Sequence, residues 1–273
     1  FVYRKLSELL GPDQPSYGLV TPPEPFTSIE LMAAHYISEL KTIQPSGPYH
    51  VGGYCFGGVI AFEMARQLEM QGDKVALLAL IDSAPPNMQR ESRLSPALAA
   101  HFVRTFPSWV SSQLEDGIAP LCLRMLRRAK AALDKRFARR QAGDGNEAAS
   151  GVNELRERIN RVIDFTNYPE HYKRYAEVHW AALDCYKPQI LPGRITLFRT
   201  ARPRLFEFEA ERFWSKLATG GVDVQIVPGT HEKVLESPNV EVLASEMRAR
   251  LGIPREVDAI RSQHGSLARR KAA

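Results

Sequence analysis

The sequence predicts an α/β protein in which helices flank a mostly parallel central sheet and a large helical insertion interrupts the chain. Three observations lead to this prediction. Short apolar runs of strand length alternate with segments of helical periodicity. One of these runs, Val75 to Ile81 (VALLALI), is apolar throughout, as expected of a central parallel strand. A long and mostly helical stretch, residues 87–185, separates the early strands from the late ones.

The elements before the insertion follow from periodicity and from helix-end signals. Apolar residues at helical spacing, with Thr27 as N-cap, indicate a first helix, and Gly72 is expected to end the second. A short strand runs into a cluster of glycines, and the continuous apolar strand ends at Asp82. We therefore expect, in order, a helix over 27–43, a strand over 49–54, a helix over 59–71 and a strand over 75–81.

Strand signals return after the insertion, over 194–199 (RITLFR) and 222–227 (VDVQIV), and a final helix is expected over 240–251. This order assigns residues 1–86 and 186–252 to the α/β core and residues 87–185 to a helical lid. The segment at 141–151 (QAGDGNEAASG) is predicted to be a mobile loop within the lid. The basic tail, residues 253–273, is predicted to be disordered.

The composition of the chain limits the classes of protein to which it can belong. The chain of 273 residues suits one α/β domain or two small ones. Neither a membrane-spanning run nor a signal peptide is visible, so a cytoplasmic protein without membrane contact is expected. Three widely spaced cysteines fit a reducing compartment and argue against a disulfide framework or a bound metal. The net charge of +5 is concentrated in residues 121–141 and the tail, so nucleic acid is not an expected partner.

The chemistry is expected at the run Gly52 to Gly58 (GGYCFGG), where Gly53 and Gly57 stand two residues either side of Cys55. This is the G-x-S-x-G pattern of a nucleophile elbow, with cysteine at the serine position. Larger side chains at the two glycine positions should collide with neighbouring backbone in so sharp a turn. The turn places Cys55 at a helix N-terminus, which favours the thiolate, and aims the N–H of Phe56 at a developing oxyanion. The alternative is a small buried thiol that packs beside glycines.

A cysteine nucleophile needs a base and an orienting acid. Of the seven histidines, His231 is the best placed, because it follows the last strand and comes late in the chain. Asp82 ends a strand at the edge of the sheet where catalytic groups gather, and no acid follows the 194–199 strand before Glu207. Asp82 would then fix the tautomer of His231 and stabilise its imidazolium form. A surface-loop histidine and a capping aspartate remain the alternatives.

Four segments resemble the type I thioesterase domains that end polyketide and nonribosomal peptide synthases. They are LGPDQPSYGLVTPPEPFTSIELMAAHYISELKTIQPSGPYH, YHVGGYCFGGVIAFEMARQLEMQGDKVALLALIDSAPP, CYKPQILPGRITLFRT and VPGTHEKVLESPNVEVLASEMRARL. The resemblance covers residues 1–90 and 178–252 and is generic over the lid. It implies an α/β-hydrolase fold and an acyl or peptidyl substrate on the phosphopantetheine arm of a carrier protein. No cofactor bound by the domain itself is implied.

By the same resemblance, Cys55 takes the chain as a thioester, His231 deprotonates the incoming nucleophile and Asp82 orients His231. Release is then to water, to an internal hydroxyl or amine, or to a second small molecule. Two departures stand out. The family has a glycine-rich loop that gives a second oxyanion N–H, and this donor is expected upstream of Phe1. Most members also carry serine where this chain has Cys55, and a serine-to-cysteine replacement engineered to trap the acyl-enzyme is an open alternative.

The lid offers one further candidate feature. Residues 121–141 contain eight Lys or Arg residues and one Asp, with the apolar residues on one helical stripe. Arg127, Arg128 and Arg136 are candidates for docking an acidic carrier domain, and the alternative is a solvated lid helix. Two other functions stay open in the same fold, a stand-alone type II thioesterase that edits misprimed carriers and a non-catalytic binding module. The long insertion disfavours the editing enzyme, which tends to have a short lid.

Overall fold

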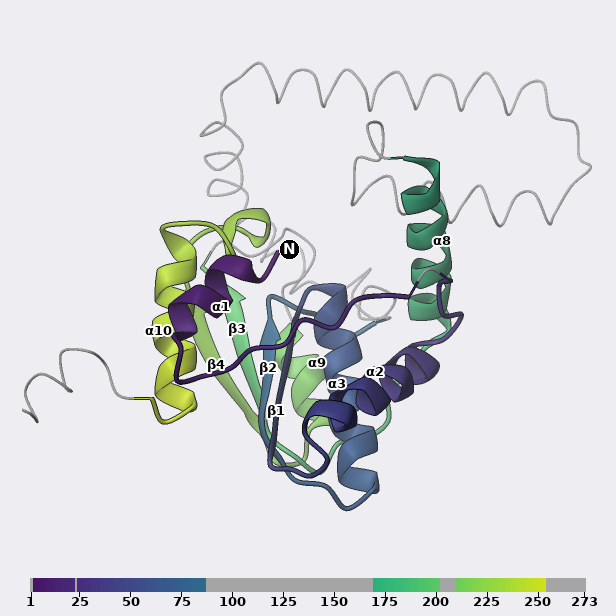
Figure 1. The fold of residues 1–273 in the computed structure, drawn as a ribbon, viewed down its shortest axis with the longest axis horizontal. Coiled ribbons are helices and arrows are strands. Elements are labelled where there is room, and N and C mark those ends of the chain that lie inside the picture. The colour runs from purple at the N-terminus through teal and green to yellow at the C-terminus, as the bar shows by residue number, and fades with distance from the viewer. Residues whose placement is uncertain (1, 23, 87–168, 202–209, 254–273) are drawn as a thin grey trace, which may run out of the picture.

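The computed structural model of this chain describes residues 2–22, 24–86, 169–201 and 210–253 (Figure 1). The predicted loop at 141–151, most of the predicted lid and nearly all of the tail lie outside these residues. No helix among the described residues is long and apolar enough to cross a membrane. The elements are, in chain order, α1 (Arg4–Leu10), α2 (Ile29–Ile43), β1 (Tyr49–Tyr54), α3 (Phe56–Met70), β2 (Val75–Ile81), α8 (Glu170–Cys185), β3 (Ile195–Thr200), α9 (Ala210–Leu217), β4 (Val222–Val227), the short 3-10 helix η1 (His231–Lys233) and α10 (Asn239–Arg250).

Four strands form one sheet in the order β1-β2-β3-β4, and each neighbouring pair is parallel. All four predicted strands are confirmed. Three have the predicted bounds, and β3 begins and ends one residue later. Because the strands are parallel, their carboxyl ends share one edge of the sheet, where the loops that follow β1, β2 and β4 come together.

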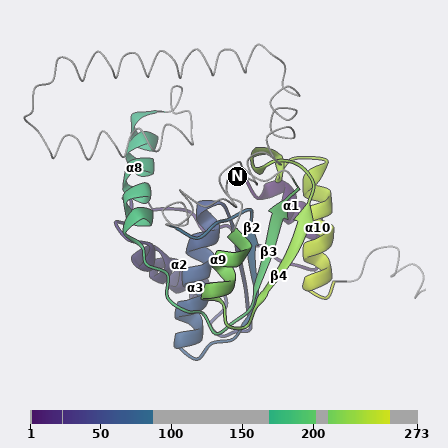
Figure 2. The same ribbon diagram turned by 180° about the vertical axis from the view of Figure 1, so that it is seen from behind.

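Helices cover both faces of the sheet (Figures 1 and 2). The helices α2, α3 and α9 pack on one face, and α1 and α10 lie side by side on the other. Side chains of β2 alternate between the two layers, with Leu78 and Leu80 in the α3 layer and Ala79 and Ile81 in the α10 layer. Burial on both faces accounts for the apolar residues from Leu78 to Ile81, whereas Ala76 near the start of the strand is exposed.

The starts of α2 and α3 differ from the predictions by two and three residues, whereas the other predicted helix ends agree to within one residue. The N-cap of α2 is Ser28 and not Thr27, and the Ser28 Oγ accepts a hydrogen bond from the N–H of Leu31 at 3.2 Å. The helix α3 begins at Phe56, three residues earlier than predicted, because the glycine-rich turn leads directly into it. Gly72 follows its last turn with a φ of +84°, a conformation that glycine adopts without steric cost.

Two short helices were not predicted from the sequence. In α1 the buried residues Leu6 and Leu10 are four positions apart and pack in the same cluster as α10. In α9 the buried Trp214 packs its ring 4.9 Å from the ring of Phe62 on α3. Seven or eight residues give too little periodicity to separate a helix from a loop, so tertiary packing decides both elements.

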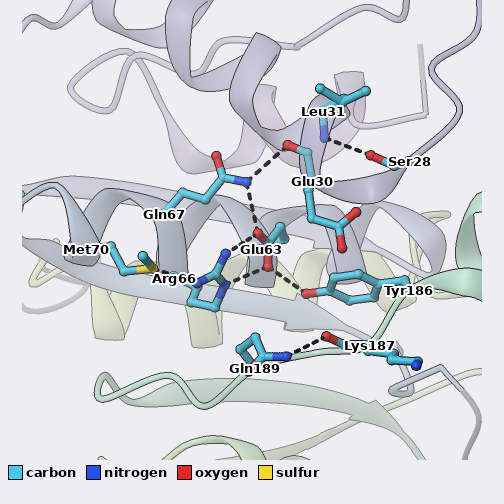
Figure 3. A network of polar contacts seen from close by, with 10 residues as sticks. All are labelled: Ser28, Glu30, Leu31, Glu63, Arg66, Gln67, Met70, Tyr186, Lys187 and Gln189. Carbon is cyan, nitrogen blue, oxygen red and sulfur yellow. Dashed lines mark hydrogen bonds and ion pairs between the residues drawn. The ribbon is translucent and has the colours of Figure 1, made fainter.

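The helix α8 is the described end of the predicted lid, and a buried polar network ties the residue after it to α3 (Figure 3). Tyr186 donates a hydrogen bond to Glu63 at 2.7 Å, Arg66 donates to both carboxylate oxygens at 2.7 and 2.8 Å, and Gln67 donates at 2.9 Å. Burial raises the pKa of Glu63, but these donors together hold it below its ordinary value. The carboxylate is therefore ionised, and it fixes the point where α8 meets the helix that begins after Cys55.

Candidate active site

Cys55 occupies a strained turn between β1 and α3. Its backbone has φ 54° and ψ −119°, which an L-residue rarely adopts. The N–H of Cys55 donates to the carbonyl of Ile81 at 3.0 Å, and its own carbonyl accepts from the N–H of Gly58 and from Ser83 Oγ at 3.0 and 2.8 Å. Backbone bonds to the neighbouring strand and helix therefore hold the turn in its strained form, with the half-buried thiol at the N-terminus of α3.

The glycines of the turn are required to different degrees. A Cβ on Gly53 would lie 2.1 Å from the carbonyl oxygen of Gly57, so only glycine fits there. A Cβ on Gly57 would meet the hydroxyl of Tyr3 at 3.1 Å, which is a side-chain contact and not the backbone collision predicted. A Cβ on Gly58 would lie 2.5 Å from the side chain of Ser83. Gly58 is thus a second required glycine, which the motif alone did not indicate.

Asp82 and His231 are joined by a buried hydrogen bond. Asp82 follows β2, His231 opens η1 after β4, and the Nδ1 of His231 lies 2.8 Å from Asp82 Oδ2. The two side chains are 7% and 5% exposed. Thr200, the last residue of β3, donates its N–H and its hydroxyl to Asp82 Oδ1 at 2.9 and 3.0 Å. The carboxyl ends of three neighbouring strands therefore supply this cluster.

The charge of Asp82 is set by these partners. Burial raises the pKa of its carboxyl, but the hydrogen bond from His231 and the two from Thr200 outweigh it and hold the pKa below its ordinary value. Asp82 is therefore ionised at neutral pH and accepts from the Nδ1–H of the imidazole. This arrangement leaves Nε2 as the nitrogen that can accept a proton when the ring is neutral.

Two residues next to this cluster, Tyr54 and Ser83, were missed from the sequence. Tyr54 donates its hydroxyl to the carbonyl of His231 at 2.6 Å. Ser83 contacts the carbonyl of Cys55, and its own carbonyl accepts from the indole N–H of Trp214 at 2.9 Å. Ser83 directly follows a strand-end acid, and Tyr54 directly precedes the candidate nucleophile. The only signal in the sequence was therefore that each stands next to a predicted site residue.

Phe56, the predicted oxyanion donor, is the first residue of α3, so its N–H has no partner within the helix. Its ring stacks on that of His179 from α8, with centroids 5.4 Å apart at 15°. Tyr175 packs edge-on against the same imidazole at 5.6 Å. Burial lowers the pKa of His179, so the ring that covers Phe56 is neutral.

Other predicted site residues lie beyond what the structure describes. Arg127, Arg128 and Arg136 fall within residues 87–168, and no contact of theirs is described. Among the described residues, no group of three or more His, Cys, Asp or Glu side chains could hold a metal ion.

Known proteins provide an independent comparison. A family model described as "Thioesterase domain" matches residues 2–251. Chondramide synthase cmdD of Chondromyces crocatus is 26% identical over 265 residues, which cover 94% of this chain and 6% of that protein. Polyketide synthase PksR of Bacillus subtilis is 45% identical over 78 residues, 29% of this chain and 3% of that protein. The chain thus spans a small part of the length of these synthases.

Solved structures agree with this family match. The NocB thioesterase domain from the nocardicin cluster is 25% identical, with a TM-score of 0.56 over 92% of this chain and 87% of that one. The four-domain nonribosomal peptide synthetase AB3403 is 22% identical, with a TM-score of 0.60 over 93% of this chain and 18% of that one, and shows the same fold. With a family model that matches nearly its whole length, this chain belongs to the thioesterase-domain family, with an α/β-hydrolase fold that resembles the chain-releasing domains of polyketide and nonribosomal peptide synthases.

Proposed function

We propose that this thioesterase domain takes an acyl or peptidyl chain from a carrier-protein phosphopantetheine onto Cys55 and then transfers it to an alcohol, an amine or water. One observation carries the proposal. A buried, ionised Asp82 is hydrogen-bonded to His231 at 2.8 Å, and Ile81, the residue before Asp82, accepts a hydrogen bond from the backbone N–H of a strained cysteine at a helix N-terminus. An imidazole oriented by a carboxylate beside a nucleophile is the working arrangement of acyl-transfer enzymes.

In the first proposed step, His231 Nε2 takes the proton of Cys55, and Sγ attacks the carbonyl carbon of the carrier thioester. The carbonyl oxygen becomes an oxyanion that the N–H of Phe56 can stabilise from the first turn of α3. The tetrahedral intermediate collapses, the phosphopantetheine sulfur leaves and takes the proton from His231. The chain is then held as a thioester on Cys55. Asp82 stays ionised throughout and stabilises the imidazolium.

In the second proposed step, His231 removes a proton from the acceptor as its oxygen or nitrogen attacks the acyl carbon. Sγ of Cys55 leaves and recovers a proton from the imidazolium, which restores the enzyme. Transfer from a thioester to serine is downhill, whereas transfer to cysteine is nearly isoenergetic and leaves an activated acyl group. More free energy is therefore left for the second step, and we propose that this domain uses it for ester formation or ring closure more than for hydrolysis.

The partners and the setting follow from this chemistry. A carrier domain delivers the substrate, and a small-molecule acceptor is needed where release is intermolecular. Phosphopantetheine belongs to the carrier, and the two steps use no cofactor of this domain. A free catalytic thiol persists in a reducing compartment, so we propose a cytoplasmic location. Charge reversal of Arg127, Arg128 and Arg136 should raise KM for a carrier-bound substrate and leave a small thioester unaffected, if these residues dock the carrier.

The experiment that tests the proposal is intact-mass analysis after mixing the protein with an acyl-loaded carrier domain. The expected result is a mass gain equal to the acyl group, which Cys55→Ala abolishes. Asp82→Asn, which keeps the shape of the side chain, should slow the gain without abolishing it. A mass gain that persists in Cys55→Ala would overturn the assignment of the nucleophile.

Products then separate the possible acceptors. Incubation with candidate alcohols and amines should give ester or amide from the wild-type protein and a larger share of free acid from Cys55→Ser. Equal shares of free acid from both proteins would remove the argument that sulfur directs the chain away from water. If Cys55→Ser instead has normal releasing activity and the native gene encodes serine, the cysteine is an engineered trap.

A further inference from the structure

Tyr54 lies directly before Cys55 in the chain, and its side chain contacts the other half of the site. Its hydroxyl donates a hydrogen bond to the carbonyl of His231 at 2.6 Å. Its ring centroid lies 4.6 Å from that of the imidazole, and the two ring planes meet at 31°. The two contacts act on different parts of the histidine, one on its backbone and one on its ring.

The hydrogen bond fixes the loop that carries His231. This residue opens a 3-10 helix of only three residues, too short to hold its own position. Its ring is tied to Asp82, and the bond from Tyr54 ties its backbone to the end of β1. His231 is thus held at its ring by Asp82 and at its backbone by Tyr54, the residue that directly precedes Cys55 in the chain.

The ring contact acts on the charge of the histidine. An aromatic ring tilted by 31° at a centroid distance of 4.6 Å still turns part of its negative face toward the imidazole, and this face attracts a cationic imidazolium more than a neutral imidazole. His231 is 5% exposed, so water screens the attraction weakly. The contact therefore strengthens when the imidazole becomes protonated.

Tyr54 is itself held in place from a distant part of the chain. Its backbone N–H donates to the hydroxyl of Tyr3 at 2.8 Å. Tyr3 directly precedes α1, and its hydroxyl also approaches Gly57 in the first turn of α3. Tyr3 thereby fixes Tyr54 from the edge of β1 that faces away from β2.

We propose that Tyr54 is a positioning residue for His231, which holds the histidine loop through its hydroxyl and favours the imidazolium through its ring. This inference rests on the proposed function, because it assumes that His231 becomes protonated when Cys55 is activated. It predicts that the two contributions can be separated, because Tyr54→Phe keeps the ring and removes the hydroxyl, whereas Tyr54→Leu removes both.

The test is an NMR titration of the His231 imidazole in a Cys55→Ala background, combined with turnover of a small thioester by the same Tyr54 variants with Cys55 intact. Tyr54→Phe should leave the titration midpoint unchanged and lower turnover by about 3- to 10-fold, the effect of one lost hydrogen bond. Tyr54→Leu should also lower the midpoint, by about 0.4 to 1.5 pH units, because the aromatic face is lost.

Tyr49→Phe is the matched control, since it removes a tyrosine hydroxyl that donates to the backbone carbonyl of Gln44 at the other end of β1. It should change neither the midpoint nor turnover. The inference would be overturned if Tyr54→Leu left the titration midpoint of His231 unchanged. It would also be overturned if Tyr49→Phe lowered turnover as much as Tyr54→Phe does. If Tyr54→Leu does not fold, the turnover comparison of Tyr54→Phe with Tyr49→Phe still decides the hydroxyl role. The titration does not depend on turnover, so it tests the inference about Tyr54 by itself. Failure of the proposed function would be seen separately, because turnover would then survive in Cys55→Ala.

Discussion

Alanine substitutions at the three glycines of the Cys55 turn should have sharply different effects, although the glycines lie within six residues of one another. In Gly53→Ala the new methyl group would lie 2.1 Å from a backbone oxygen and 2.2 Å from its carbon, so the turn or the start of α3 must move. Overpacking of this kind costs about 1–3 kcal/mol, and a collision with backbone belongs at the upper end. We expect Gly53→Ala to lose about 3 kcal/mol of unfolding free energy.

The two helical glycines should respond less. In Gly58→Ala the methyl group would lie 2.5 Å from both Cβ and Oγ of Ser83. Rotation of the Ser83 side chain would move Oγ and break its bond to the Cys55 carbonyl, but it would leave Cβ in place, so the backbone must also shift. A gain in helix propensity of up to about 1 kcal/mol offsets part of the cost, so a net loss of about 1–2 kcal/mol is expected. In Gly57→Ala the nearest atom is the Tyr3 hydroxyl at 3.1 Å, and the result should lie within about 1 kcal/mol of wild type.

Urea unfolding of the wild-type protein and the three variants measures these differences in unfolding free energy. The rate of Cys55 alkylation by iodoacetamide reports whether the turn keeps its shape. Gly18→Ala is the control, because no atom lies within 4 Å of the added methyl group. Alkylation should change most in Gly53→Ala and least in Gly57→Ala. A loss in Gly57→Ala as large as that in Gly53→Ala would refute the steric reasoning, because it would show that the motif position and not the local distance sets the cost.

Three further predictions concern polar contacts and strain. Tyr186→Phe removes a hydrogen bond to the buried carboxylate of Glu63 and should cost about 1.5–3 kcal/mol in urea unfolding, against about 0.5–1.5 kcal/mol for Tyr36→Phe, whose hydroxyl donates to a neutral side chain. Since the pKa of Glu63 is lowered in the folded protein, its contribution is complete above about pH 4.3 and is lost as the pH falls further, and Tyr186→Phe should lessen that loss. Asp82→Asn should lower kcat by roughly 10³- to 10⁴-fold with little change in KM, because the amide no longer fixes the imidazole tautomer; a drop below tenfold would contradict the role of Asp82. Cys55→Gly should be at least as stable as Cys55→Ala by thermal unfolding, because the φ of 54° costs alanine about 1–2 kcal/mol and costs glycine nothing.

The strands, and Asp82 and His231 as a pair, could be predicted because each depends on local pattern. An apolar run of seven residues bounded by Asp82 is readable without knowledge of its neighbours. Thr200 illustrates what could not be predicted. It is one more residue at a strand end, and its two hydrogen bonds to Asp82 exist only because β2 and β3 are adjacent in the sheet. Strand order depends on packing between distant segments, which periodicity does not encode.

The glycines show a second limit of the same kind. The motif correctly placed a required glycine at Gly53, where the collision is with backbone four residues further on. It did not indicate Gly58, whose requirement comes from Ser83 in the loop after β2. Ser28 was missed as the N-cap of α2 for a related reason, since it stands beside Thr27 and both can cap. Which of the two caps depends on how the first turn is packed.

Strain in the described part of the chain is concentrated at the proposed site. Among these residues, the non-glycine positions with positive φ are Cys55 and Asp82, at 54° and 43°. Each is held by its N–H, which donates to a carbonyl of the next strand, Ile81 for Cys55 and Phe198 for Asp82. The sheet therefore holds both residues in conformations that they would not keep alone. Because these bonds run from β1 to β2 and from β2 to β3, loosening β2 should release both residues together, and activity should be lost before the chain unfolds as a whole.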